Sequence, residues 1–143
     1  LKVKKEVSVE TQLLRSPLTK DTMQYLIDTY PYRLWNTNNA SGLHGTAMLS
    51  KVPWTQISTQ TGDTQADDEG RTIVAEFPHF TLVNSYAQQS GLQAENLPKR
   101  NVYMGALSAL ILRLQQQTPH KQVILAGDLN ATFAKTDGHI QCN

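Results

Sequence analysis

The chain has 143 residues, 39% of them hydrophobic, and its 13 basic and 12 acidic residues give a net charge of +1. This length suffices for one hydrophobic core and predicts one domain rather than two. The balanced charge excludes a broadly basic surface for nucleic acid, so any contact with DNA must depend on local charge.

Cysteine content and hydropathy indicate the compartment. The single cysteine, Cys142, excludes an internal disulfide framework and suits a reducing environment. No stretch approaches the roughly 20 apolar residues that span a bilayer, and KVKKEV near the start is not a signal sequence. We therefore expect a soluble intracellular chain without membrane contact, in the nucleus, the cytoplasm or a mitochondrion.

A strand and a helix are predicted at the start of the chain. Residues 3–9 place valines among polar side chains, which is typical of a strand, and this strand ends at Glu10. A helix of about a dozen residues follows, with Pro17 near its start and Pro31 closing it. Its apolar stripe consists of Met23, Leu26 and Ile27.

The middle of the chain predicts strands separated by polar loops. Residues 32–35 form a short strand, and the turn-forming residues from Asn36 onward form a loop. Residues 44–51 and the stretch after Pro53 are two further strands. Residues 59–68 contain no large apolar side chain, so we expect an exposed polar loop.

Two paired strands and a second helix come next. Residues 71–77 and 80–86 are rich in strand-forming residues and close in sequence, which favours an antiparallel pair. The helix runs from about Pro98 to Gln117. Its apolar face is expected to pack on the sheet that carries residues 127–130, GDLN. This face consists of Val102, Ala106, Leu107, Leu110, Ile111 and Leu114.

Residues 121–130, KQVILAGDLN, are the most informative segment. The short apolar run predicts a buried central strand that delivers Asp128 and Asn130 to its end, where α/β sheets commonly hold reacting groups. An acid two residues before an amide places both side chains on one side of an extended chain, where one can take a proton and the other can donate to an oxyanion. The alternative is a Gly-Asp turn in which the Asn satisfies backbone groups.

The acidic cluster Asp67, Asp68 and Glu69 is a second candidate site. A metal site is one interpretation, but adjacent strand residues point to opposite faces, which favours a solvated loop edge. Arg71 is then expected to anchor the following turn through paired hydrogen bonds. The spacing of the four histidines does not match that of metal ligands in known sites. These residues are His44, His79, His120 and His139.

Five segments of the chain form an ordered set. They are the strand ending at Glu10, GLHGTAMLSK (42–51), DDEGRTIVAEF (67–77), LVNSYAQQSG (82–91) and GDLN (127–130). With this ordered set, residues 7–130 resemble the exonuclease III and apurinic/apyrimidinic endonuclease branch of the endonuclease/exonuclease/phosphatase superfamily. The resemblance implies an α/β fold, part of a four-layer sandwich with mixed, largely antiparallel sheets, and a single partial domain over residues 1–143.

The resemblance also implies a reaction and its residues. The reaction is hydrolysis of a DNA phosphodiester bond at abasic sites or 3′ ends, with Mg²⁺, or Mn²⁺ in its place, as cofactor. Tyr86, Asp128 and Asn130 match the family's catalytic residues, and Glu10 matches its metal-binding glutamate. The structural alternatives are a core or interface role for Tyr86 and turn or helix-cap roles for Asp128 and Asn130. For Glu10 the alternative is a solvated acid at the end of a strand.

DNA contacts are implied for Gln89, at an amide position after the tyrosine, and for Arg100, at a basic position of the second helix. A solvated helix end is the alternative for Arg100. Two positions depart from the family pattern, because Val9 stands in place of Gln and Gln88 in place of Pro. The Gln88 departure predicts a looser loop after Tyr86.

The functional prediction has alternatives. The family's upstream Asn-containing motif does not precede Glu10, and its late Asp strand and SDH-type motif do not occur before Asn143. We therefore expect the middle of a nuclease domain, whose activity alone is in doubt because such groups act as a unit. The alternatives are a catalytically inactive DNA-binding or protein-interaction module, with a partner chain completing the sheet, and a retroelement-type endonuclease.

Overall fold

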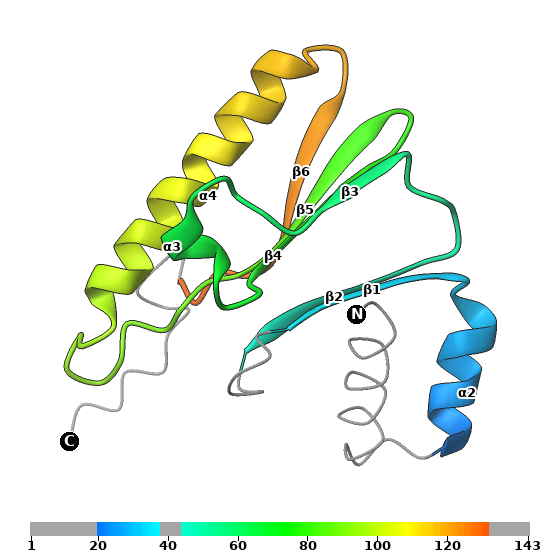
Figure 1. Ribbon diagram of the computed structural model, residues 1–143, viewed down its shortest axis with the longest axis horizontal. Helices are drawn as coiled ribbons and strands as arrows, with labels where there is room; N and C mark the ends of the chain where they lie inside the picture. The colour runs from blue at the N-terminus through cyan, green and yellow to red at the C-terminus, as the bar shows by residue number, and fades with distance from the viewer. Residues whose placement is uncertain (1–19, 38–43, 132–143) are drawn as a thin grey trace.

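The computed structural model describes residues 20–37 and 44–131 (Figure 1). Cys142, His139, Pro17 and the predicted strand ending at Glu10 lie outside these residues. The described elements are α2 (Lys20–Thr29), β1 (Tyr32–Thr37), β2 (Gly45–Ser50), β3 (Gln56–Ser58), α3 (Thr64–Asp67), β4 (Thr72–Glu76), β5 (Phe80–Tyr86), α4 (Leu97–Gln117) and β6 (Gln122–Asp128). In this part of the chain, no helix is long and apolar enough to cross a membrane.

The strands form two sheets. β1 and β2 pair antiparallel, and the larger sheet has the order β3-β4-β5-β6. Pairing in the larger sheet is antiparallel except between β5 and β6, which run parallel. Parallel neighbours need a crossover connection, and α4 supplies it. The prediction of an α/β fold with mixed, largely antiparallel sheets is confirmed.

Strand β4 separates two apolar clusters because its side chains alternate between the faces of the sheet. Val74 lies in the cluster under α4, together with Val83 and Ala87. The other face carries Ile73 and its alternating neighbours. This second cluster contains Met48, Ile73, Ala75 and Phe77, with Leu34, Trp54 and Ile57 packed at its border.

The described elements lie in layers, with α4 on one face of the four-stranded sheet and β1-β2 on the other (Figure 1). Side-chain amides connect the sheets, since Asn36 Nδ2 donates to Thr72 O at 2.8 Å and Asn84 Nδ2 donates to Ala47 O at 3.0 Å. Helix α2 lies beside β1-β2 (Figure 1), and Arg33 in β1 donates to Ile27 O in the last turn of α2 and to Tyr30 O just after it. The four-layer sandwich stays a prediction.

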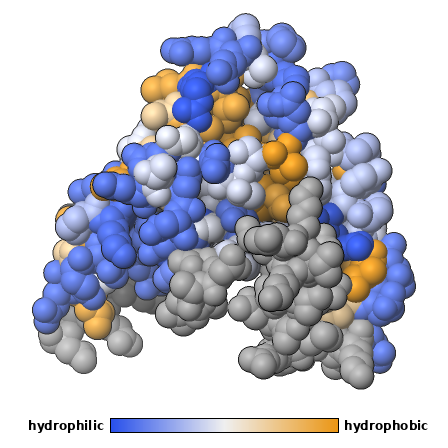
Figure 2. All heavy atoms as spheres, viewed as in Figure 1, coloured by the Kyte–Doolittle hydropathy of each residue, from blue (hydrophilic) through white to orange (hydrophobic). Residues whose placement is uncertain are grey.

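Strand β6 differs from the buried central strand predicted from its apolar run. It is an edge strand of the sheet as described, and its residues Ile124 and Leu125 are 42% and 38% exposed. Figure 2 shows hydrophobic residues reaching the surface between hydrophilic ones on the face in view. An apolar run indicates that other segments must pack on a strand, but it does not identify those segments. The buried central strand is β4.

The stretch 59–68 is mostly exposed, as predicted, but it is not only a loop. Thr61 and Ala66 are buried, and α3 forms within it. Polar side chains make this possible: Asp67 accepts bonds from Thr61 N, Thr61 Oγ1 and Gly62 N, and Asp63 caps the helix by accepting from Gln65 N. The carboxylate of Asp67 therefore has a structural role in this turn.

Two helix and strand predictions need correction. The predicted loop begins at Asn36, but strand β1 continues through Asn36 and Thr37. All six residues of β1 pair with β2. Helix α4 covers the predicted range, but Tyr103 takes the place of Val102 on its buried face, since Tyr103 is fully buried and Val102 is 38% exposed. The remaining buried residues of α4 are those predicted, namely Ala106, Leu107, Leu110 and Leu114.

Candidate active site

The carboxyl ends of β5 and β6 bring two predicted catalytic residues side by side. Tyr86 and Asp128 are register partners at the last position of their parallel strands. The next residue continues the ladder, because Ala87 N donates to Asp128 O at 2.9 Å. Register partners share a face of the sheet, and neighbouring Asn84 bonds to β2 from that face. The tyrosine and the acid therefore face the side of the smaller sheet.

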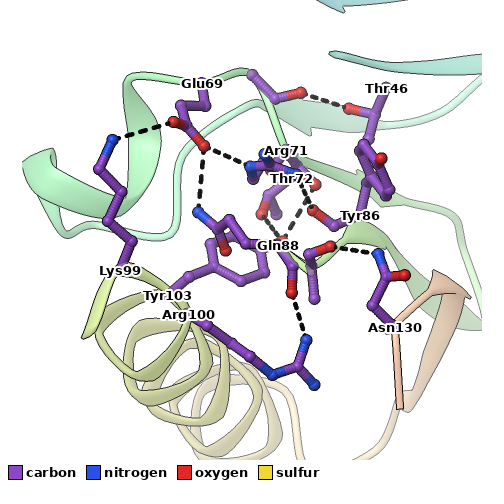
Figure 3. A network of polar contacts seen from close by, with 12 residues as sticks. Thr46, Glu69, Arg71, Thr72, Tyr86, Gln88, Lys99, Arg100, Tyr103 and Asn130 are labelled. Carbon is purple, nitrogen blue, oxygen red and sulfur yellow. Dashed lines mark hydrogen bonds and ion pairs between the residues drawn. The ribbon is translucent and has the colours of Figure 1, made fainter. Parts of the chain in front are cut away.

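Asn130 reaches the same place through a turn. Its φ is 46°, in the left-handed region that asparagine tolerates, so the prediction of an extended Asp128-to-Asn130 segment is wrong. Asp128 Oδ1 accepts from Asn130 N at 2.8 Å. The side chain of Asn130 is also bonded, because Nδ2 donates to Ala87 O at 2.8 Å (Figure 3). This geometry matches the alternative prediction, a Gly-Asp turn in which the Asn side chain satisfies a backbone group. An amide has two N–H donors, so the second remains for a ligand oxygen.

Gly127 allows β6 to approach β5 just before Asp128. Its φ is +123°, and a Cβ at this position would overlap the carbonyl oxygen of Ser85. Only glycine combines this dihedral angle with such a close contact. The glycine of the GDLN segment thus fixes where the acid emerges.

Arg100 braces the two loops that follow β5 and β6. Its guanidinium group donates to Gln88 O (Figure 3) and, at 3.1 Å, to Leu129 O. The predicted DNA contact is therefore half-buried between backbone carbonyl groups at the first turns of α4. Because guanidinium carries five N–H donors, these two bonds leave others for a phosphate.

A buried ion pair lies behind Tyr86. Arg71 Nε donates to Glu69 Oε2 at 2.6 Å, and the two side chains are 4% and 14% exposed. Gln88 Nε2 donates to the same carboxylate oxygen at 3.2 Å, and Lys99 Nζ lies 3.7 Å from the other (Figure 3). Burial alone would raise the pKa of Glu69, but hydrogen bonds from Arg71 and Gln88 and the charges of Arg71 and His44 lower it. The predicted turn anchor is confirmed, and Glu69 is its partner.

Tyr103 is a site residue that the sequence analysis missed. Its hydroxyl group forms hydrogen bonds with Thr72 Oγ1 at 2.8 Å, Ser85 Oγ at 2.7 Å and Arg71 O at 3.1 Å. It therefore holds the ends of β4 and β5 together from the α4 side. A signal was available, because the helical spacing places Tyr103 on the face of Leu107, Leu110 and Leu114.

A hollow of about 250 Å³ lies next to Tyr86, and Glu69 and Arg71 are among the residues that line it. Gln89, the second predicted DNA contact, lies at its border. The side chains that line it combine positive, negative and amide groups, as a site for a polar ligand requires. They are His44, Glu69, Arg71, Tyr86, Gln88, Gln89, Asn96 and Lys99.

Comparison with known proteins identifies the family. The model of the Endonuclease/Exonuclease/phosphatase family matches residues 8–143. The chain belongs to this family. The resemblance predicted from the ordered segments is therefore confirmed.

Curated relatives of this family member include DNA repair enzymes. The chain is 31% identical over 109 residues to "DNA repair nuclease APEX1" of Danio rerio, which covers 76% of the chain and 34% of that protein. It is 29% identical over 130 residues to "DNA-(apurinic or apyrimidinic site) endonuclease" of Dictyostelium discoideum, covering 90% and 34%. "Recombination repair protein 1" of Drosophila melanogaster is 31% identical over 96 residues, covering 67% and 14%. The chain spans about a third or less of the length of these relatives.

Endonucleases of this family generally use a divalent metal ion. Within residues 20–37 and 44–131, no three His, Cys, Asp or Glu side chains converge as a ligand set. Glu69 is bonded to Arg71 and Gln88, whereas the exposed carboxylate of Asp128 is a hard oxygen donor at the strand ends. Glu10 lies outside the described residues. The described part thus offers one fitting carboxylate rather than a complete site.

Proposed function

We propose that this family member hydrolyses phosphodiester bonds of double-stranded DNA, at abasic sites or at 3′ ends, in base excision repair. One observation carries the proposal. Tyr86 and Asp128 are register partners at the ends of parallel strands, and Asn130 folds back beside them. An acid, a phenol and an amide at one point form a set that can act on a phosphate and a water molecule.

Each residue has a role in an in-line displacement. The Asp128 carboxylate orients the attacking water and takes its proton as the new P–O bond forms and the bond to the leaving oxygen breaks. Asn130 Nδ2 and the Tyr86 hydroxyl group donate to phosphate oxygens whose charge grows in the transition state. Mg²⁺, or Mn²⁺, bound through Glu10 would offset negative charge on the phosphate.

Gln89 and Arg100 are the proposed DNA contacts. Gln89 lies at the hollow beside Tyr86, and Arg100 lies between the loops after β5 and β6. The near-neutral chain has no general attraction for DNA, so such local contacts must set its register on the duplex. The names of the relatives support a DNA substrate, and we extend it to this chain by proposal.

A second candidate is an inactive module that assembles with a partner chain. Strand β6 has no neighbour on its outer side among the described strands, and Ile124 and Leu125 are exposed there. An uncovered strand edge with apolar residues favours pairing with another chain. We prefer the nuclease, because a binding module does not require Tyr86, Asp128 and Asn130 at one point.

Cleavage of a labelled abasic-site duplex in Mg²⁺ tests the proposal. The wild-type chain should cut, EDTA should abolish cutting, and Asp128→Asn should reduce kcat by about 100-fold or more, because it removes the proton acceptor. Asp28→Asn, which changes an acid on α2, is the control and should cut like the wild type. A folded wild-type chain that does not cut would contradict the nuclease and favour the module.

A further inference from the structure

We propose that Arg71 and Glu69 are positioning residues for Tyr86: the ion pair fixes the guanidinium group, and the guanidinium group fixes the tyrosine ring at the hollow. The catalytic meaning of this pair rests on the proposed function. Its geometric meaning, a restrained Tyr86, can be measured independently of activity.

Arg71 holds Tyr86 at three points. The backbone of the two residues is paired, with Tyr86 N donating to Arg71 O at 2.9 Å. The side chain of Arg71 returns to the same residue, because Nη1 donates to Tyr86 O at 3.0 Å. The guanidinium carbon also lies 4.9 Å from the centre of the Tyr86 ring, where a cation is attracted by the π face. One arginine thus fixes both the backbone and the ring of the proposed catalytic tyrosine.

Glu69 in turn fixes Arg71. An arginine side chain has several rotatable bonds, and its planar fork is directed only when a partner occupies it. Glu69 Oε2 takes the Nε donor at 2.6 Å and leaves Nη1 directed at Tyr86 O. The lowered pKa of Glu69 keeps the carboxylate charged, which strengthens this bond. Tyr103 supports the arrangement from behind by donating to Arg71 O.

Gln88 supports the same carboxylate at a cost to stability. A carboxylate only accepts, so the Gln88 amide must turn its nitrogen to Glu69. Its oxygen is then buried without a hydrogen-bond partner among the described residues. A buried acceptor without a partner destabilises a fold. The orientation of the Gln88 amide is therefore better explained by its hydrogen bond to Glu69 than by a gain in stability.

The location of the pair separates positioning from general stability. A buried ion pair is weak evidence for stability, since apolar residues of similar volume often serve as well. This pair lies at the rim where β4 begins and β5 ends, and it lines the hollow with Tyr86, outside both apolar clusters. An apolar pair of residues could fill the same space, but it could not place a cation against the ring of Tyr86.

Fluorine NMR of the chain labelled with 3-fluorotyrosine tests the proposal on Tyr86 itself. The chain has five tyrosines, and Tyr86→Phe assigns the resonance. Arg71→Met and Glu69→Gln should shift or broaden the Tyr86 resonance, and Arg71→Lys should return it part of the way towards the wild-type position. Arg71→Lys and Glu69→Gln nearly keep side-chain volume, so they carry the test if Arg71→Met does not fold.

Two control variants remove similar interactions elsewhere. Arg113→Met removes a side-chain bond to Thr61 O, and Glu76→Gln weakens the ion pair with Lys121. Both should leave the Tyr86 resonance unchanged. A Tyr86 resonance that is the same in wild type, Arg71→Lys and Glu69→Gln overturns the proposal, whether or not the chain cleaves DNA.

Kinetics connect the restraint to catalysis. If the wild type cleaves the abasic duplex, Glu69→Gln should lower kcat by about tenfold and change KM by less than about twofold, because a misplaced group affects the transition state more than ground-state binding. Equal kcat values in wild type and Glu69→Gln would overturn the catalytic part. A wild type that does not cleave contradicts the proposed function alone, and the fluorine signal still decides the restraint.

Discussion

Glu69 illustrates how a single carboxylate can organise a site without touching the reacting atoms. It binds Arg71 and Gln88 and lies near Lys99, each from a different segment. The sequence predicts Arg71 as an anchor but places Glu69 at a solvated loop edge. Sequence spacing could not reveal the partner, because a bend at Gly70, with φ of +67°, brings Glu69 back onto Arg71 Nε.

The lowered pKa of Glu69 predicts a pH-dependent contribution to stability. The folded-state pKa lies below the ordinary glutamate value of about 4.3, so the contribution is present above that value and is lost as pH falls through the folded-state pKa. Below both values the protonated group contributes nothing by this route. Urea unfolding from pH 7 to pH 3 should therefore show a free-energy difference between wild type and Glu69→Gln that shrinks in acid. A difference that is constant over this range would contradict the prediction.

At the scale of elements, the strongest local patterns gave reliable predictions. The periodicity of α4 and the apolar runs of β4 and β5 located these elements nearly to the residue, because the spacing of apolar residues within one element is a local signal. The pairing of β5 with β6 has no local signal, since it depends on where α4 returns the chain. The left-handed turn at Asn130 also has none, because asparagine tolerates that conformation without requiring it.

Gly127→Ala tests the close approach of β6 to β5. The substitution should destabilise the chain by about 2 kcal/mol or more, because it adds backbone strain and a steric overlap with Ser85 O. Gly105→Ala in α4 is the matched control, since nothing lies near its added Cβ, and it should stabilise by about 0.5–1 kcal/mol. Both follow from urea unfolding curves. Equal stabilities of the two variants would mean that β6 does not need glycine at this point.

For the molecule as a whole, the ordered motifs predicted the family and the α/β class, and three of the predicted site residues lie together. What they did not predict was the exposure of β6. The alternation along a strand shows which of its side chains share a face. Which segments pack against that face depends on the whole fold. Glu10 and its metal role stay a prediction outside the described residues.

Arg100→Ala tests how the chain contacts DNA. Duplex affinity should fall, and the slope of log affinity against log salt should decrease in magnitude by about 1, because one phosphate contact is lost. Arg113→Ala on the same helix removes a comparable bond to backbone, at Thr61 O, and should leave the slope unchanged. The measurement is a fluorescence-anisotropy titration at several salt concentrations. An unchanged slope for Arg100→Ala would limit this residue to bracing the loops.

The parallel pairing of β5 and β6 has a consequence for the order of folding. The antiparallel pair β4-β5 closes through a short turn, and α4 can form from local bonds, but Tyr86 meets Asp128 only after the whole helix has docked on the sheet. Non-local parallel pairing forms slowly because loop-closure entropy is lost before its contacts are gained. We therefore expect the candidate active site to assemble last during folding and to open first under mild denaturation, so activity should disappear before helical structure does.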